Sequence, residues 1–393
     1  MLTKNPTDNI HDRAAIDLIP AIEAAAPVTE ATGSLPVDLL DKLHAARLFH
    51  MLSPRSIGGE QVDLITFFHA IEAIASADAS TAWCVGQACG VSMAAAYLDG
   101  SAAREIFGGE RSVVASGPNS RTAKAVKVPG GYRVTGNWVF ASGSRHAQWL
   151  GGHSTVYESD GTAAKTAEGK PVDRTMLFLK SKAQISDVWQ VMGLRGTGSD
   201  NYEVTDLFVP EEHTYTRDAD ADRRVHAPLY RSFTGFNIFG LGFSAVALGI
   251  ARSMMRDFID LAAKKTPQAG GHTLKDNAVI QSKVAIAQAQ LMSARALVLD
   301  IYGELWDKAQ QGEPFTLNDR ARMRMASTYA MNQGREVSDF AYHAAGGTAI
   351  FAEYPFERRF RDIHCASQQG QAHQSNFEVI GQVFLGVTPK ARV

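Results

Sequence analysis

Apolar positions recur at helical spacing through the first hundred residues. The stretch 14–25 is amphipathic, and the apolar residues of 39–48 form one face of a helix that follows a proline suited to a first helical turn. The runs 67–77 and 83–98 are rich in small and apolar residues, which is typical of closely packed, buried helices. The pattern predicts an N-terminal helical domain over residues 1–111.

The pattern changes to short β-rich runs in the middle of the chain. Residues with high strand propensity cluster at 125–128, 132–134, 176–179 and 202–209. Turn residues such as Pro129, Gly130 and Gly131 separate these runs. We predict a central β-domain over residues 112–222, in which the polar segment 154–174 forms a surface hairpin or loop.

Helical periodicity returns in three long segments, 239–263, 277–310 and 318–345. Each is longer than an average globular helix and rich in alanine, methionine and leucine, so we expect residues 223–393 to form a helical bundle. Parts of these helices carry few charges, which would leave apolar stripes exposed on a monomer. The sequence therefore favours a homo-oligomer.

Composition and charge argue against several classes of partner and site. The 393 residues are 45% hydrophobic and 20% charged, and 39 Lys and Arg residues nearly balance 41 Asp and Glu residues. This balance provides no net field to attract nucleic acid or an anionic membrane surface. Three cysteines without CxxC spacing argue against a disulfide framework or a zinc site, and no secretory signal or transmembrane helix is visible in the sequence pattern. We expect a cytoplasmic protein.

Three strings, in order along the chain, carry a family resemblance. They are GGYRVTGNWVFASGSRHA at 130–147, VWQVMGLRGTGSDNYEVTDLFVP at 188–210 and AGGTAIFAEYPFERRFRD at 345–362. Together with the order helix, β, helix, they resemble the acyl-CoA dehydrogenase superfamily across nearly the whole chain. The resemblance implies an α+β fold with an N-terminal helical domain, a central β-domain and a C-terminal four-helix bundle.

A finer resemblance is to one branch of that superfamily. The strings ASG at 141–143 and DVWQVMGLRGTGS at 187–199 are similar to two-component, reduced-flavin-dependent monooxygenases that act on steroid-ring phenols, hydroxyphenylacetate or indoles. The implied function is that of the oxygenase component, which uses FADH2 or FMNH2 and O2, through a C4a-hydroperoxyflavin, to hydroxylate a phenol- or indole-type small molecule. The implied partners are that aromatic substrate, further copies in a homotetramer and a separate NAD(P)H:flavin reductase, since this chain has no nicotinamide-binding motif.

The acid that acyl-CoA dehydrogenation requires is missing from its two usual places. Removal of an α-proton from a thioester needs a carboxylate beside the flavin. The resemblance places this base shortly after the RD at 361–362 or early in the first long C-terminal helix, yet residues 363–377 and 223–256 contain no Asp or Glu. Glu378 is the nearest acid. A dehydrogenase with a relocated base and a non-catalytic flavin-fold binding subunit stay open as alternatives.

The same resemblance implies a set of binding residues. Those expected to hold the flavin are Trp83, Ser116, Gly117, Pro118, Asn119, Phe140, Ala141, Ser142, Gly346, Gln368 and Gln369. Lys265 is expected to pair with the flavin phosphate, in its own or a neighbouring subunit. An apolar wall made by Val91, Met93 and Ala94 suits a flat aromatic substrate.

Two residues are expected to take part in catalysis. The resemblance places the Ser142 hydroxyl where it can bond the flavin ring edge near N5. Related phenol hydroxylases carry a histidine after the RD segment, but here that position falls at Gln368 or Gln369, whose amides cannot deprotonate a phenol. His373 is therefore the acid–base candidate, because histidine exchanges protons readily near neutral pH. The structural alternatives are a core aromatic at Trp83, a strand-end hydroxyl at Ser142 and a surface histidine at His373.

Overall fold

The N-terminal part of the chain is a cluster of α-helices. The computed structural model describes residues 9–118, 120, 122–217, 219–268, 271–389 and 391. The helices of this part are α1 (Ile10–Asp17), α2 (Ile19–Thr32), α3 (Val37–Ala45), α4 (Leu64–Ala77), α5 (Ala79–Ser92) and α6 (Gly100–Phe107). Asp63 and Asp78 accept hydrogen bonds from the free backbone N–H groups at the starts of α4 and α5, which fixes where these two helices begin.

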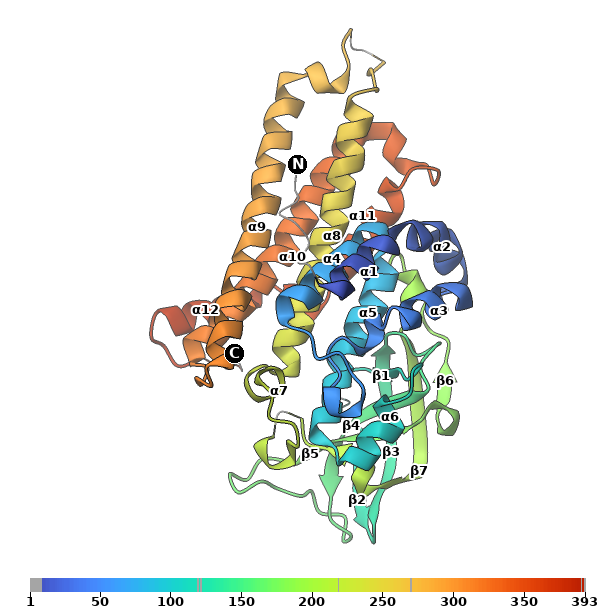
Figure 1. The fold of residues 1–393 in the computed structure, drawn as a ribbon, viewed down its shortest axis with the longest axis vertical. Helices are drawn as coiled ribbons and strands as arrows, with labels where there is room; N and C mark the ends of the chain where they lie inside the picture. Colours follow the sequence, from blue (N-terminus) through green and yellow to red (C-terminus); the bar gives the residue numbers. More distant parts are fainter. Residues whose placement is uncertain are drawn as a thin grey trace.

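The middle of the chain forms a mixed β-sheet, which lies below the N-terminal helices in Figure 1. Its strands are β1 (Val114–Ser116), β2 (Lys124–Val128), β3 (Gly131–Ala141), β4 (Trp149–Tyr157), β5 (Asp173–Leu179), β6 (Gln184–Ser186), β7 (Asp200–Pro210) and β8 (Thr214–Tyr215). The strand order is β6-β7-β3-β2-β4-β5-β8, and β1 pairs with β4 in parallel. Trp138 and Tyr202 stack inside this domain with ring centroids 5.2 Å apart, and both donate hydrogen bonds to main-chain carbonyls of β4.

The last part of the chain is helical again. Its helices are α7 (Pro228–Ser232), α8 (Gly235–Ala262), α9 (Ala278–Gln310), α10 (Leu317–Ala345), α11 (Phe356–Ala366) and α12 (Ser375–Phe384). Figure 1 shows α8, α9 and α10 side by side, and they extend well beyond the N-terminal helices. Buried Glu72 of α4 pairs with Arg252 of α8 and with Arg295 of α9, so ion pairs join this bundle to the N-terminal part.

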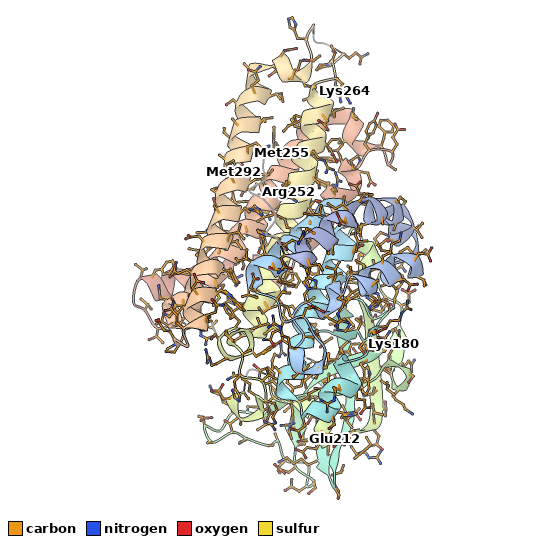
Figure 2. The ribbon with its side chains drawn as sticks, viewed as in Figure 1. Lys180, Glu212, Arg252, Met255, Lys264 and Met292 are labelled. Carbon is orange, nitrogen blue, oxygen red and sulfur yellow. The ribbon has the colours of Figure 1, made fainter. Side chains whose placement is uncertain are left out.

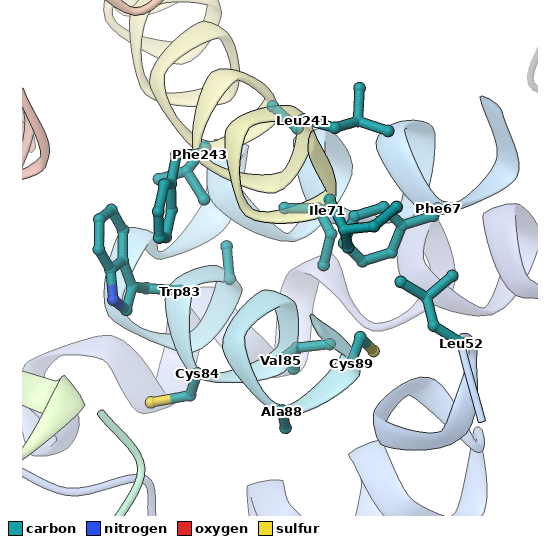
Figure 3. Packing of buried hydrophobic residues seen from close by; sticks show 14 of the residues in the cluster. Leu52, Phe67, Ile71, Trp83, Cys84, Val85, Ala88, Cys89, Leu241 and Phe243 are labelled. Carbon is teal, nitrogen blue, oxygen red and sulfur yellow. The ribbon is translucent and has the colours of Figure 1, made fainter. Parts of the chain in front are cut away.

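A continuous apolar core runs between α4, α5 and α8. Figure 3 shows Phe67 and Ile71 of α4 facing Leu241 of α8, with α5 beneath them. At the edge of this core, the Trp83 indole lies parallel to the Phe243 ring, with centroids 4.2 Å apart. Each fully buried aromatic ring of this kind contributes roughly 1.5–3 kcal/mol to folding, so this core fixes α8 against α5.

The predicted fold is confirmed. The element type changes from helix to strand between Phe107 and Val114, and back to helix between Tyr215 and Pro228. The prediction of a hairpin or loop for the polar segment 154–174 is confirmed as a hairpin, because Ser154 and Thr155 of β4 pair with Arg174 and Asp173 of β5. Residues 155–157 of β4 also pair in parallel with β2 on the other side.

Within the described residues, α8 and α9 are long and apolar enough to cross a membrane by length and composition alone. In α8, 89% of the most apolar window is buried inside the protein, so the core explains its composition. In α9 the buried share is 28%, and Val279, Ile286 and Met292 are exposed there. Met292 is labelled in Figure 2. The apolar character of α9 is therefore mostly a surface property of the single chain.

A buried aspartate on α11 holds the turn that precedes β7. Asp362 Oδ1 accepts a hydrogen bond of 2.7 Å from the backbone N–H of Leu194, which adopts a left-handed φ of 52°. A Cβ added at Gly193 would lie 2.3 Å from the main chain of Arg361, so glycine is required for this close approach. Burial, reinforced by the charge of Asp78, raises the pKa of Asp362 to about 7.

Replacement of Asp362 by asparagine should flatten the pH dependence of stability. The folded pKa lies above the value of about 4 for an unfolded aspartate. The unfolded state therefore releases its proton first, and the stability that this carboxyl group contributes falls as pH rises from about 4 through 7. Between pH 5.5 and pH 8, the melting temperature should fall more for the wild type than for Asp362→Asn. This variant keeps an oxygen facing the Leu194 N–H.

The exposed aspartate Asp99 provides the control for this measurement. Asp99→Asn should retain the wild-type difference in melting temperature between the two pH values. Equal differences in Asp362→Asn and the wild type would show that the Asp362 carboxyl group does not titrate in this range.

Candidate active site

One large cavity lies where the helices and the sheet meet. Its volume is about 890 Å³, which is in the range of sites for small molecules and cofactors. Its walls come from α5, the end of β3, the start of α8, α10 and the segment that follows α11. The cavity therefore depends on all three parts of the fold.

The cavity brings together most of the residues that the resemblance implied. Lining residues from that set are Trp83, Val91, Met93, Ala94, Ser116, Gly117, Pro118, Phe140, Ser142, Gln368 and Gln369. They come from segments as far apart in sequence as α5 and the residues after α11. The expected substrate wall and most of the expected flavin cradle thus share one space.

A directed chain of hydrogen bonds runs along the cavity wall. Thr197 Oγ1 donates to the Leu194 carbonyl at 2.8 Å and lies 2.7 Å from Ser199 Oγ, so Ser199 must donate to Thr197. Ser199 Oγ lies 2.7 Å from Ser142 Oγ, and Trp83 Nε1 donates to Ser142 Oγ at 3.1 Å. Because Ser199 donates to Thr197, the Ser142 hydroxyl must donate its proton to Ser199. The Ser142 oxygen accepts from Trp83 and keeps a second lone pair for a ligand N–H group.

The end of β3 is shaped to expose two side chains to the cavity. The pairing of β3 with β7 is irregular between Trp138 and Ala141, and Phe140 adopts a left-handed φ of 58° there. Phe140 and Ser142 line the cavity, while Ala141 between them is buried outside it. A conformation of this kind in a bulky residue costs on the order of 1 kcal/mol or more and is concentrated at functional sites.

The backbone of β3 also lies close to the segment after β1. A Cβ added at Gly117 would lie 1.9 Å from the carbonyl oxygen of Val139. Only glycine therefore allows the main chain next to Ser116 and Pro118 to reach the cavity wall.

His153 is a cavity residue that sequence reasoning missed. It lies on β4, where its Nδ1 is 2.7 Å from Thr175 Oγ1 and its Nε2 is 3.4 Å from Ser116 Oγ. Burial, reinforced by the charge of Arg217, lowers the pKa of His153 well below its usual range. The imidazole is therefore neutral at physiological pH. No signal in the sequence pointed to it, because β4 is buried on both faces along most of its length and shows no apolar–polar alternation.

Several predicted residues do not reach the cavity. His373 is exposed, with its Nδ1 2.7 Å from Ser375 Oγ, and it does not line the cavity of the single chain, so its acid–base role stays a prediction. Lys265 donates a hydrogen bond to Thr348 Oγ1 at 2.8 Å and lies beside Gly346. Asn119 lies outside the described residues.

The position of Lys265 follows from the length of α8. At 1.5 Å per residue, the end of α8 is about 28 Å from Phe243, which lines the cavity at the other end of the helix. The neighbouring Lys264 marks this far end in Figure 2. Within one chain, Lys265 and Gly346 therefore do not contact a ligand in the cavity, and their expected flavin contact stays a prediction for a neighbouring subunit.

The described lining of the cavity has no acid that could act as a dehydrogenase base. Among its lining residues that the structure describes, none is Asp or Glu, and the formal charges are those of Arg217 and Arg324. Glu378, the nearest acid by sequence, is exposed on α12 and does not line the cavity. The walls suit planar aromatic rings and offer neutral hydrogen-bonding groups, which fits a flavin and an aromatic molecule together.

Comparison with known proteins agrees with this geometry. Residues 9–105 match the N-terminal domain of acyl-CoA dehydrogenase, and residues 241–374 match the acyl-CoA dehydrogenase C-terminal domain. The chain is 30% identical over 391 residues to the oxygenase subunit HsaA, a flavin-dependent monooxygenase of Mycobacterium tuberculosis, covering 96% of this chain and 95% of that protein.

Further relatives are of the same kind. Indole-3-acetate monooxygenase of Pseudomonas putida is 28% identical over 353 residues, which cover 90% of this chain and 87% of that protein. The crystal structure of the HsaA monooxygenase from M. tuberculosis superimposes with a TM-score of 0.87 at 26% identity, covering 97% of this chain and 98% of the other. The chain therefore belongs to the flavin-dependent monooxygenases that are built on the acyl-CoA dehydrogenase fold.

Proposed function

We propose that this chain is the oxygenase component of a two-component monooxygenase and hydroxylates an aromatic or heteroaromatic small molecule. It is an oxidoreductase, and reduced flavin is its cofactor. The observation that carries the proposal is the cavity itself, which has the hydroxyl and indole groups of a flavin site and lacks an acid among its described lining residues. That combination serves oxygen transfer and does not serve proton abstraction from a thioester.

The residues around Ser142 suit the reduced state of the cofactor. The bound flavin, in its reduced form, supplies the electrons that activate O2 for transfer of one oxygen atom to a ring. The Ser142 oxygen offers an acceptor, and a reduced flavin carries an N–H at N5 where an oxidised flavin does not. Stacked Trp83 and Phe243 exclude water from this end of the cavity.

Neutral groups position the substrate in this proposal. Val91, Met93 and Ala94 form the apolar wall for a flat ring, and Gln368 and Gln369 offer amides from the segment after α11. Neutral His153 can accept or donate one hydrogen bond without adding charge. The side chains therefore orient the ring and exclude water.

Anaerobic mixing followed by oxygen tests the function directly. The protein is combined with reduced FMN or FAD and then mixed with oxygenated buffer in a stopped-flow instrument. We expect a transient absorption distinct from both reduced and oxidised flavin, which persists for seconds or longer. Reoxidation at the rate of free flavin would contradict the proposal and favour a non-catalytic binding subunit.

Replacement of Ser142 by alanine should weaken reduced-flavin binding about tenfold. The change removes the acceptor oxygen and leaves the Trp83 N–H without its partner, a loss on the order of 1–2 kcal/mol. Affinity is measured anaerobically by titration with reduced FMN. The control is Ser144→Ala, because Ser144 lies in the same loop but donates to the Gly198 carbonyl and does not line the cavity. An equal loss in both variants would refute the role of Ser142.

We also propose that four copies of the chain assemble in the cytoplasm and receive reduced flavin by diffusion from a separate reductase. The exposed apolar side chains of α9 support the assembly, because a lone chain would leave Val279, Ile286 and Met292 in water. A groove of about 410 Å³ between α9, α10 and α12, with Leu297 and Phe384 in its lining, is a second apolar surface that involves α9.

A charge on α9 should break this assembly. Met292→Glu would place a carboxylate in the proposed contact, at a cost of several kcal/mol if the contact buries it. Analytical ultracentrifugation should show tetramers for the wild type and smaller species for the variant. Glu212→Lys, at the other end of the molecule in Figure 2, should remain tetrameric. A Met292→Glu tetramer would contradict the proposed interface.

A further inference from the structure

A buried histidine of β4 lies in the wall of the cavity. His153 is 8% exposed, and its Nε2 is 3.4 Å from the Oγ of Ser116, a residue expected to contact the flavin. At the other end of the ring, Nδ1 is 2.7 Å from Oγ1 of Thr175, which faces His153 in the register of β4 and β5. His153 and Ser116 line the cavity, whereas Thr175 is buried outside it. The Nε2 end of the imidazole is therefore the end that is turned to the cavity.

The same strands connect His153 to the apolar wall expected for the substrate. Thr175 also pairs in register with Tyr215 of β8, whose ring centroid lies 5.9 Å from that of Tyr97. Tyr97 ends a short 3-10 helix that begins at Met93, a residue of the apolar wall. Both tyrosines line the cavity. His153 therefore lies between the residues expected to hold the flavin and those expected to contact the substrate.

The hydrogen bonds around His153 assign the proton to one ring nitrogen. Ser116 has a single hydroxyl proton, and its shortest contact with an acceptor is the 2.9 Å contact with the Gly151 carbonyl oxygen. The Ser116 oxygen therefore faces Nε2 with a lone pair, and this contact is attractive only when Nε2 carries a hydrogen. Burial and the charge of Arg217 keep the ring neutral, with one N–H. Nδ1 is then the acceptor for the Thr175 hydroxyl.

The Nε2–H group of His153 is weakly used within the protein. Its 3.4 Å contact with Ser116 Oγ is longer than the separation of about 2.7–3.2 Å that N–H···O hydrogen bonds prefer. A ligand oxygen in the cavity can therefore take this hydrogen bond without displacing a strong partner. A neutral imidazole N–H also stabilises negative charge on such an oxygen without a change in its own protonation.

We propose that the Nε2–H group of His153 binds an oxygen carried by the aromatic ring of the substrate, and so determines specificity for oxygen-bearing rings. This assignment rests on the proposed oxygenase function, because it places the flavin at the Trp83–Ser142 end of the cavity. The hydrogen bond holds the oxygen-bearing edge of the ring against the β-domain while the ring itself lies along the apolar wall. Because a hydrogen bond to a charged oxygen is stronger than one to a neutral oxygen, the same contact favours the ionised form of a phenol.

Matched aromatic ligands test the assignment. Anaerobic titrations of the protein with reduced FMN compare 2-naphthol with 2-methylnaphthalene, which has a similar shape and no oxygen. We expect His153→Leu to lower the ratio of the 2-naphthol affinity to the 2-methylnaphthalene affinity about tenfold, the effect of one buried hydrogen bond. His153→Gln keeps an N–H donor and should retain part of the ratio. The control His213→Leu lies in the same domain, where His213 pairs with Glu105 and does not line the cavity, and it should keep the wild-type ratio.

Two results would overturn the proposal. One is a ratio that is unchanged in His153→Leu, or a wild type that binds neither ligand. The other is a loss of reduced-FMN affinity in His153→Leu with an unchanged ratio, which would assign the donor to a carbonyl oxygen of the flavin.

A second variant covers a failure of His153→Leu to fold. Thr175→Val removes the hydroxyl that donates to Nδ1, so the Nε2–H form loses its support and the ratio should fall. An unchanged ratio in Thr175→Val would refute the assigned tautomer and, with it, the proposal. A ratio that depends on His153 in a protein without the stopped-flow transient would support the donor site while contradicting the oxygenase function. The transient with an unchanged ratio would do the reverse.

Discussion

The contact of Trp83 with Phe243 and Ser142 is the point on which the site depends, because each residue comes from a different part of the fold. Trp83 belongs to the N-terminal helices, Ser142 follows the last strand residue of β3, and Phe243 lies on the core helix of the bundle. Stacking fixes the plane of the indole, and the hydrogen bond fixes its direction. The fold therefore closes the cavity and orients its polar wall through the same side chain.

Sequence reasoning recovered the features that repeat along the chain. Long helices have a strong apolar period, and the strings around Ser142, Leu194 and Asp362 sit where the chain must turn or approach another segment closely. Such positions tolerate few residue types, so they can be recognised without coordinates. This is why the fold was predicted, and why most of the residues expected to hold the flavin line one cavity.

The rest of the site depends on distances that no local pattern encodes. His153, Arg217 and Arg324 meet at the cavity from a strand, a loop and a helix, and none of them has a distinctive neighbourhood in the sequence. His373 was expected to act as an acid or base, and a short 3-10 turn at Gly370–Ala372 leaves it on the surface of the single chain. A difference of a few residues in such a turn decides which side chain faces inward.

The neutral imidazole of His153 in the cavity wall has a consequence for how the protein responds to its surroundings. Burial lowers the pKa of His153 well below its usual range, so this imidazole stays neutral across the range in which cells operate. Changes of rate with acidity would then report on the small molecules that enter, since ionisation of a ligand alters both its fit and its reactivity. The charge of such a pocket stays constant with pH while the ionisation of a bound ligand changes, so the pH dependence of the rate reports the ionisation of the ligand.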